Sequence, residues 1–126
     1  MQLGELEKQV LKYLWKNAEA DVKQVHQAMS QKRQSSLNTV QSAVERLFRK
    51  GLLTRRKLGH AFLYQAKVDK EGLISQLIET VTNDFVEKGE SSLLAAFSSV
   101  SSRMDESELD ALERLIEQQR ALRKSQ

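Results

Sequence analysis

The side chains with the clearest chemical role lie between Ser35 and Gly51, in the segment SSLNTVQSAVERLFRKG. Along this segment the polar side chains are mostly amides and hydroxyls at the beginning and cations toward the end. They are Asn38, Thr39, Gln41, Ser42, Glu45, Arg46 and Arg49. Amides and hydroxyls can hydrogen-bond to the edges of DNA bases, and arginine suits guanine edges or phosphates. The segment therefore predicts a surface that reads DNA, although an ordinary solvated helix face has a similar composition.

The same segment predicts one amphipathic helix. Ser36 can cap its start, Gly51 can supply a left-handed stop, and Arg49 and Lys50 suit the negative end of the helix dipole. The apolar residues recur at steps of three and four, so they share one face that can pack inward. These residues are Leu37, Val40, Val44, Leu47 and Phe48.

Two further helices are expected before this one. Residues 3–17 place Leu3, Leu6, Val10, Leu11, Leu14 and Trp15 along one side of a helix. Asp21 can cap a second, short helix that carries Val22, Val25, Ala28 and Met29 and fades over residues 31–34. A short helix and a polar link before the 36–50 helix are typical of a helix-turn-helix.

A β-hairpin is predicted after Gly51. Residues 52–57 and 61–66 are rich in large, aromatic or β-compatible side chains, and they flank the turn Leu58-Gly59-His60. Three helices followed by a basic hairpin make a winged helix, whose wing can reach the DNA backbone or minor groove. The candidate wing residues are Arg55, Arg56, Lys57 and His60. Charge on an exposed strand can also serve only to prevent aggregation.

The second half of the chain is expected to be helical. Asp69 can cap a first helix, which ends near Gly89. Either Ser91 or Ser92 can cap the second helix, and Asp105 begins a capping box for the last one. Three amphipathic helices of this size have few ways to bury their apolar faces alone, so an identical chain is the expected partner, with folding back on the first half as the alternative. The candidate dimer residues are Ile74, Leu77, Ile78, Val81, Phe85, Leu93, Phe97, Leu109, Leu112 and Ile116.

The predicted fold class is thus mainly α with a small β wing. A winged-helix DNA-binding domain occupies residues 1–67, and a three-helix dimerisation region occupies residues 68–126. Through Lys67 the chain has 13 Lys and Arg against 5 Asp and Glu, whereas from Val68 onward it has 7 against 12. A basic first half beside an acidic second half indicates that the first half meets a polyanion.

Composition narrows the function further. The 126 residues include no cysteine, which excludes disulfides, thiolate metal sites and a cysteine nucleophile. His26 and His60 fall in separate predicted elements, so neither a metal nor another cofactor is expected. No carboxylate pair, nucleophile with a base, or phosphate loop is visible, so the chain is not expected to be an enzyme. No apolar run could span a membrane and no leader is apparent, so a cytoplasmic location is expected.

Three motifs resemble the penicillinase-repressor family, the BlaI/MecI/CopY type of bacterial winged-helix regulators. They are LGELEKQVLKYLW from Leu3 to Trp15, SLNTVQSAVERLFRKG from Ser36 to Gly51, and GHAFLY from Gly59 to Tyr64. The resemblance implies a homodimer that represses by covering a promoter, with Thr39, Ser42 and Arg46 at the matched recognition positions. His60 stands where the family commonly has arginine or lysine, so at neutral pH it is a weaker cation.

Two family features bear on induction. In β-lactam-responsive members, a sensor-linked protease cuts between asparagine and phenylalanine in the second C-terminal helix. Ala96 and Phe97 occupy the similar place, so cleavage there, with a sensor or protease as partner, is a hypothesis. The copper-responsive branch has a C-terminal cysteine motif, and the lack of cysteine here excludes copper sensing through thiolates.

The sequence therefore predicts a repressor that binds double-stranded DNA at a palindromic operator. Arg49, Lys50, Arg55, Arg56 and Lys57 are expected to supply mainly sequence-independent affinity through phosphates. Discrimination between sequences is expected from another set: Asn38, Thr39, Gln41, Ser42 and Arg46. Ser36 and His60 complete the candidate DNA-binding residues. The alternative is a winged-helix module whose basic face binds an acidic protein.

Overall fold

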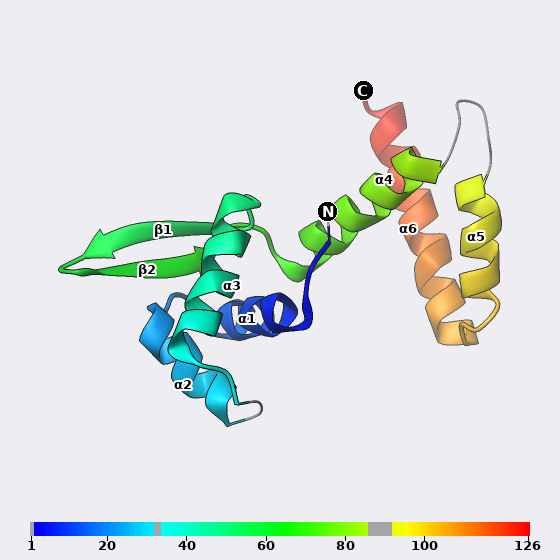
Figure 1. The fold of residues 1–126 in the computed structure, drawn as a ribbon. Helices are drawn as coiled ribbons and strands as arrows, with labels where there is room; N and C mark the ends of the chain where they lie inside the picture. Colours follow the sequence, from blue (N-terminus) through cyan, green and yellow to red (C-terminus); the bar gives the residue numbers. More distant parts are fainter. Residues whose placement is uncertain (1, 32–33, 86–91) are drawn as a thin grey trace. The chain divides into compact units, whose positions relative to one another are not determined.

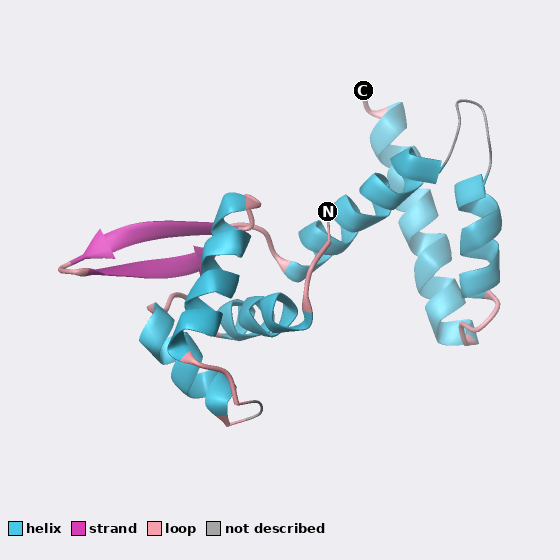
Figure 2. Cartoon of the chain, viewed as in Figure 1, coloured by secondary structure: helices cyan, strands magenta, loops and turns pink. Residues whose placement is uncertain are grey.

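The structure of the chain is a computed structural model that describes residues 2–31, 34–85 and 92–126. The first part holds α1 (Glu5–Lys16), α2 (Val22–Ser30), α3 (Leu37–Arg49) and the strands β1 (Leu53–Leu58) and β2 (Ala61–Ala66). The later helices are α4 (Lys70–Phe85), α5 (Ser92–Ser101) and α6 (Glu106–Lys124) (Figures 1 and 2). This element order confirms the predicted fold class, mainly α with a small β wing.

The core forms where the apolar faces of α1, α2 and α3 meet. Its largest fully buried side chains come from all three helices and from the residue just before β1: Val10, Leu11, Val25, Val40, Val44, Leu47 and Leu52. The hydrophobic periodicity of each helix predicts this core, with one exception. Leu37 is 37% exposed, because it lines an open cavity of about 300 Å³ beside Phe62 and His60 instead of the core.

Local hydrogen bonds set the helix boundaries where the sequence predicts them. The backbone N–H of Gln24 donates to Asp21 Oδ1 at 2.8 Å, and that of Gly72 donates to Asp69 Oδ1 at 2.7 Å. Asp105 caps α6 in the same way by accepting from the Glu108 backbone at 2.8 Å. Gly89 and Ser91, which the sequence suggests as helix boundaries, lie outside the described residues, as do residues 32–33 of the predicted polar link.

Glycines at positive φ end α3 and turn the hairpin. Gly51 has φ +80°, and the amide of the next residue, Leu52, donates to the carbonyl of Leu47 at 3.0 Å, which closes the end of α3. Gly59 has φ +63° and is the first of two residues in the hairpin turn, the place where a type II′ turn needs glycine.

The hairpin is antiparallel, and Arg55 pairs with Tyr64 in its register. Tyr64 also exchanges two backbone hydrogen bonds with Ala20, of 3.0 and 2.8 Å, so the link between α1 and α2 joins the edge of β2. Leu53 and Tyr64 are buried, whereas the residues toward the turn are exposed. The base of the wing is thus fixed to the core, and its tip extends beyond α3 (Figure 1).

The chain divides into two compact units, Met1–Thr80 and Val81–Gln126. The division falls within α4, whose residue Leu73 is buried in the first unit and whose Leu77 packs against the same core. The assignment of residues 1–67 and 68–126 to separate functional domains stays a prediction. Within the described ranges, none of the helices combines the length and apolar character needed for a membrane span.

Candidate nucleic-acid interface

The outward face of α3 is a row of exposed polar side chains. Asn38, Gln41 and Ser42 are all exposed, and within the described part of the chain their side chains have no hydrogen-bond or ion-pair partner. Three free amide or hydroxyl groups on the first two turns of one rigid helix can bond to whatever lies against it. This is the arrangement that the sequence predicts for reading base edges.

Ser36 and Thr39 interact with each other at the start of the same helix. The Ser36 hydroxyl accepts a hydrogen bond from the Thr39 backbone N–H at 3.1 Å, and the two hydroxyl oxygens are 2.8 Å apart. Ser36 therefore caps α3, as predicted. The mutual bond also fixes the direction of the Thr39 hydroxyl, which remains at the exposed surface.

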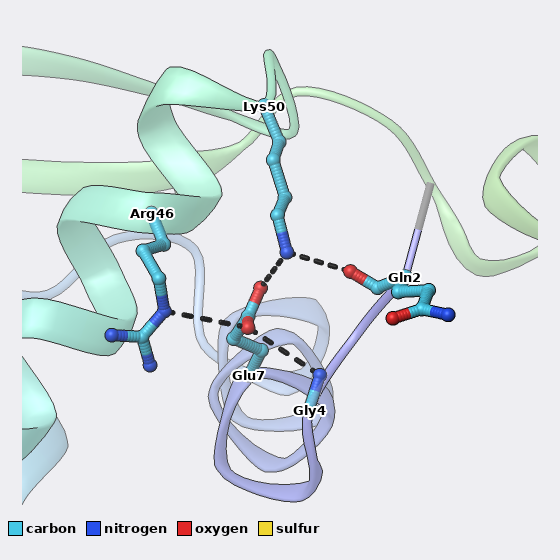
Figure 3. Close-up of polar contacts among 5 residues, drawn as sticks. All are labelled: Gln2, Gly4, Glu7, Arg46 and Lys50. Carbon is cyan, nitrogen blue, oxygen red and sulfur yellow. Dashed lines mark hydrogen bonds and ion pairs between the residues drawn. The ribbon is translucent and has the colours of Figure 1, made fainter.

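Glu7 connects the beginning of α1 with the end of α3 (Figure 3). Its Oε2 accepts a hydrogen bond from Lys50 Nζ at 2.6 Å, and its Oε1 lies 3.5 Å from Arg46 Nε. Lys50 Nζ also donates to the carbonyl oxygen of Gln2 at 2.6 Å. Lys50 is thus engaged within the chain, although the sequence assigns it to phosphate contact.

Glu7 is only 5% exposed, so its charge depends on these partners. Burial on its own raises the pKa of the Glu7 carboxyl, but the hydrogen bonds from Lys50 and the Gly4 backbone and the charges of Lys50 and Arg46 outweigh it. The net pKa is below the usual glutamate value, so Glu7 is ionised at neutral pH.

The sequence reasoning missed Glu7, although a signal was present. Glu7 lies four residues after Leu3 and three and four residues before Val10 and Leu11, which places it on the buried face of α1. A charged residue at a core position needs an opposite charge nearby, because an unpaired buried charge is costly.

Arg55 joins the wing to α3. Its guanidinium carbon lies 3.9 Å from the ring centroid of Phe48 and 4.3 Å from that of Phe62, and its Nη1 donates to Glu45 Oε2 at 3.2 Å. Two cation–π contacts and an ion pair hold the side chain, which is 26% exposed. Arg55 therefore fixes the wing against α3, and its assigned phosphate contact remains untested.

Arg56 points to the other side of the wing and pairs with Glu19. Its Nη2 and Nε donate to the two carboxylate oxygens at 2.6 and 3.1 Å. The hydrogen bond from Arg56 lowers the pKa of Glu19. Arg56 is thus already bound in two places by a carboxylate, before any DNA is present.

The remaining basic candidates are more accessible. Arg49 is 77% exposed, and among the described residues it pairs with Glu45 alone, at 3.3 Å between Arg49 Nε and the carboxylate. Lys57 and His60 are exposed near the hairpin turn, and neither forms an ion pair among the residues that the structure describes. The structure therefore separates the predicted phosphate contacts by exposure. Arg49, Arg56 and Lys57 are exposed, although Arg49 and Arg56 each form an ion pair, whereas Lys50 and Arg55 are partly buried and internally paired.

His26 supports the turn before α3. Its Nε2 lies 2.8 Å from the carbonyl oxygen of Ser35, so this nitrogen donates to the residue that precedes the cap. The sequence interpretation left His26 as a solvated or core residue. Within the described residues no group of three histidine or acidic side chains could hold a metal ion.

Comparison with known proteins decides the family. The sequence profile described as penicillinase repressor matches residues 3–118, nearly the whole chain. The chain belongs to the penicillinase repressor family. The match confirms the predicted family. Because this family consists of repressors, the prediction that the chain is not an enzyme agrees with it.

Individual members of the penicillinase repressor family are moderately similar to this chain. The transcriptional regulator BlaI of Mycobacterium tuberculosis is 30% identical over 115 residues, which cover 90% of this chain and 82% of that protein. The penicillinase repressor of Bacillus licheniformis is 29% identical over 87 residues, 69% of this chain and 65% of that protein. The chain thus matches about two thirds of the length of the Bacillus protein.

A solved structure supports the winged helix of this penicillinase-repressor chain. The solution structure of the DNA-binding domain of the repressor BlaI superimposes with a TM-score of 0.52 at 30% identity. The match covers 56% of this chain and 87% of that domain.

Proposed function

We propose that the protein is a homodimeric transcriptional repressor that binds a specific double-stranded DNA operator. The observation that carries this proposal is the row of Asn38, Gln41 and Ser42 on the exposed face of α3, which have no side-chain partner among the described residues and are followed by Arg46. A helix with such a face in a winged helix fits the major groove. The relatives named as a penicillinase repressor and a transcriptional regulator support the same function.

The ion pairs within the chain indicate which polar residues are available to contact bases or phosphates. Asn38, Thr39, Gln41, Ser42 and Arg46 discriminate between sequences through base edges, and Arg49 and Lys57 bind phosphates. Sequence-independent affinity then decreases as salt concentration rises, because phosphate contacts release counterions. Arg55 and Lys50 contribute mainly by holding α1, α3 and the wing together, and Arg56 joins the wing to Glu19 in the link between α1 and α2.

Arg46→Ala and Lys57→Ala test this division of roles. Arg46→Ala should weaken binding to operator DNA by roughly 1–3 kcal/mol and change binding to a scrambled duplex less, because a base contact is lost. Lys57→Ala should weaken both about equally and make the salt dependence less steep. The measurement is fluorescence anisotropy with DNA from upstream of the protein's own gene and a scrambled duplex, across a salt series.

Three outcomes would count against the proposal. Equal losses from Arg46→Ala and Lys57→Ala on both duplexes would contradict the assigned roles. If the wild-type protein binds the two duplexes equally at every salt concentration, the proposal of a specific operator is wrong and only charge-driven DNA binding remains. Absence of binding even at low salt would favour the alternative, a winged-helix module with an acidic protein partner.

The apolar side chains of the C-terminal helices support a dimer. None of the described residues of α5 and α6 is buried in the single chain. Seven candidate dimer residues are exposed, namely Ile74, Ile78, Val81, Phe85, Leu93, Phe97 and Ile116. Leu109 and Leu112 are half-buried, whereas Leu77 packs against the first unit. A second copy can cover such faces, and its two-fold symmetry matches a palindromic operator.

Relief of repression by proteolysis between Ala96 and Phe97 is a further step of this proposal. Both residues are exposed and lie within α5, so a sensor-linked protease would need the helix to unwind locally. Treating cells with a β-lactam is then expected to convert the intact chain into two fragments on an immunoblot. A chain that stays intact while its target genes are induced would remove this step.

A further inference from the structure

We infer that Glu7 is a positioning residue for DNA recognition: it holds the Arg46 guanidinium by its Nε and leaves the two terminal nitrogens for a base. This inference rests on the proposed function, because it assigns Arg46 to the operator. Glu7 belongs to α1 and is buried, so it acts through Arg46 and touches no DNA itself.

The nitrogens of the Arg46 guanidinium face two different directions. Arg46 Nε faces Glu7 Oε1 at 3.5 Å, and the two terminal nitrogens point away from Glu7 (Figure 3). The Arg46 side chain is 52% exposed, so these nitrogens are accessible. The guanidinium is a rigid plane, and the two terminal nitrogens can together bind O6 and N7 of one guanine.

Glu7 can hold Arg46 because its own carboxylate is fixed. Lys50 Nζ binds one oxygen at 2.6 Å, and the Gly4 backbone N–H donates to the other at 3.4 Å. Lys50 is itself held by the carbonyl of Gln2 at 2.6 Å. The buried carboxylate cannot rotate toward solvent without losing the hydrogen bonds from Lys50 and Gly4, so it presents Oε1 to the Arg46 guanidinium in a fixed orientation.

The charges in this cluster favour selectivity over affinity. Arg46 and Lys50 are cations, and Glu7 cancels one of their two positive charges. Without Glu7 both cations would be free to approach any phosphate, which increases binding to all sequences. Glu7 therefore weakens the attraction of this end of α3 to DNA phosphates of any sequence, and it orients the Arg46 guanidinium toward a base.

Glu7→Gln tests the inference, with Glu5→Gln as the matched control. Glutamine keeps the size of the side chain, but it has no charge to pair with Arg46, and one of the two oxygens that face Lys50, Gly4 and Arg46 becomes a donating NH2 group. Glu5 lies in the same turn of α1, but it is 71% exposed and its one ion pair within the described part of the chain is with Lys8, at 3.6 Å. Both changes remove one negative charge, so the control measures the effect of net charge alone.

Glu7→Gln is expected to reduce the ratio of operator affinity to scrambled-duplex affinity about tenfold, part of the discrimination of a bidentate arginine–guanine contact. Affinity for the scrambled duplex should stay equal or rise. Glu5→Gln should leave the ratio unchanged. In an Arg46→Ala background, Glu7→Gln should alter the ratio by less than about twofold, because the group it positions is absent.

A second variant guards against simple misfolding. Glu7→Met with Lys50→Met removes both members of the buried pair, a change that tends to preserve stability better than removing one. This double variant should show the same loss of discrimination with an unchanged circular dichroism spectrum.

The possible failures are distinguishable. An unchanged ratio in Glu7→Gln, while Arg46→Ala lowers it, would overturn the role of Glu7 and leave the proposed function standing. Equal weakening of both duplexes by Glu7→Gln, or full additivity with Arg46→Ala, would also overturn it, because Glu7 would then act on stability alone. Wild-type protein without sequence preference would overturn the proposed function and this inference together.

Discussion

Replacing Ile116 with glutamate is expected to turn the dimer into a monomer and to weaken operator binding more than about a hundredfold. Ile116 lies in α6 and is 47% exposed in the single chain. Burying an isoleucine contributes about 1.5–3 kcal/mol. About half of Ile116 is already covered in the single chain, and in a two-fold symmetric interface each substitution occurs twice. The lost apolar burial is therefore about 1.5–3 kcal/mol per dimer, and the buried carboxylates add a desolvation cost.

Sedimentation velocity and operator titration measure this effect together. The control is Gln118→Glu, which adds the same charge at an exposed position on the face of α6 opposite Ile116. The control should remain dimeric and bind the operator like the wild type. A dimeric Ile116→Glu protein would place the interface elsewhere, and a wild-type monomer that binds its operator tightly would refute the dimeric proposal.

Most of the fold is predictable from the sequence because local rules decide it. Ser36, Asp21 and Asp105 cap helices through hydrogen bonds to backbone N–H groups three residues ahead, and Gly51 and Gly59 adopt the positive φ that glycine tolerates. These interactions need only neighbouring residues. The hydrophobic periodicity then indicates which face of each helix is buried.

The roles of the basic side chains were predictable only in part, because long-range ion pairs decide them. Arg56 and Glu19 are 37 residues apart, and Lys50 and Glu7 are 43 residues apart. A count of cations near the wing cannot show which of them already has a carboxylate partner. The exposed residues Asn38, Gln41 and Ser42 were easier to place, since the helix period alone turns them away from the core.

Replacing Leu47 with alanine is expected to destabilise the first unit by about 2–5 kcal/mol, a large part of the stability of a domain this size. Leu47 is 0% exposed and lies in α3 between the buried Val44 and the end of the helix. Its carbonyl also accepts the Leu52 amide that closes the helix, so neighbouring backbone is tied to this position. A smaller side chain leaves a cavity that the rigid three-helix core can fill only partly.

Urea unfolding followed by tryptophan fluorescence measures this loss in the full chain. Trp15 is the one tryptophan, and its indole N–H donates to the carbonyl of Val68 at 2.9 Å, so its signal reports on the first unit. Leu58→Ala is the matched control, because Leu58 is 58% exposed in the wing and should change the unfolding free energy by less than about 0.5 kcal/mol. A small effect of Leu47→Ala would contradict the described packing of α3.

DNA binding by Leu47→Ala also distinguishes an effect on stability from an effect on recognition. Where Leu47→Ala is still folded, Asn38, Gln41, Ser42 and Arg46 remain on the opposite face of α3, so the ratio of operator to scrambled affinity should stay near the wild-type value. The apparent affinity for both duplexes should then decrease only by the fraction of unfolded protein. A selective loss of operator preference in Leu47→Ala would mean that the core of α3 sets the alignment of its recognition face as strongly as Glu7 does.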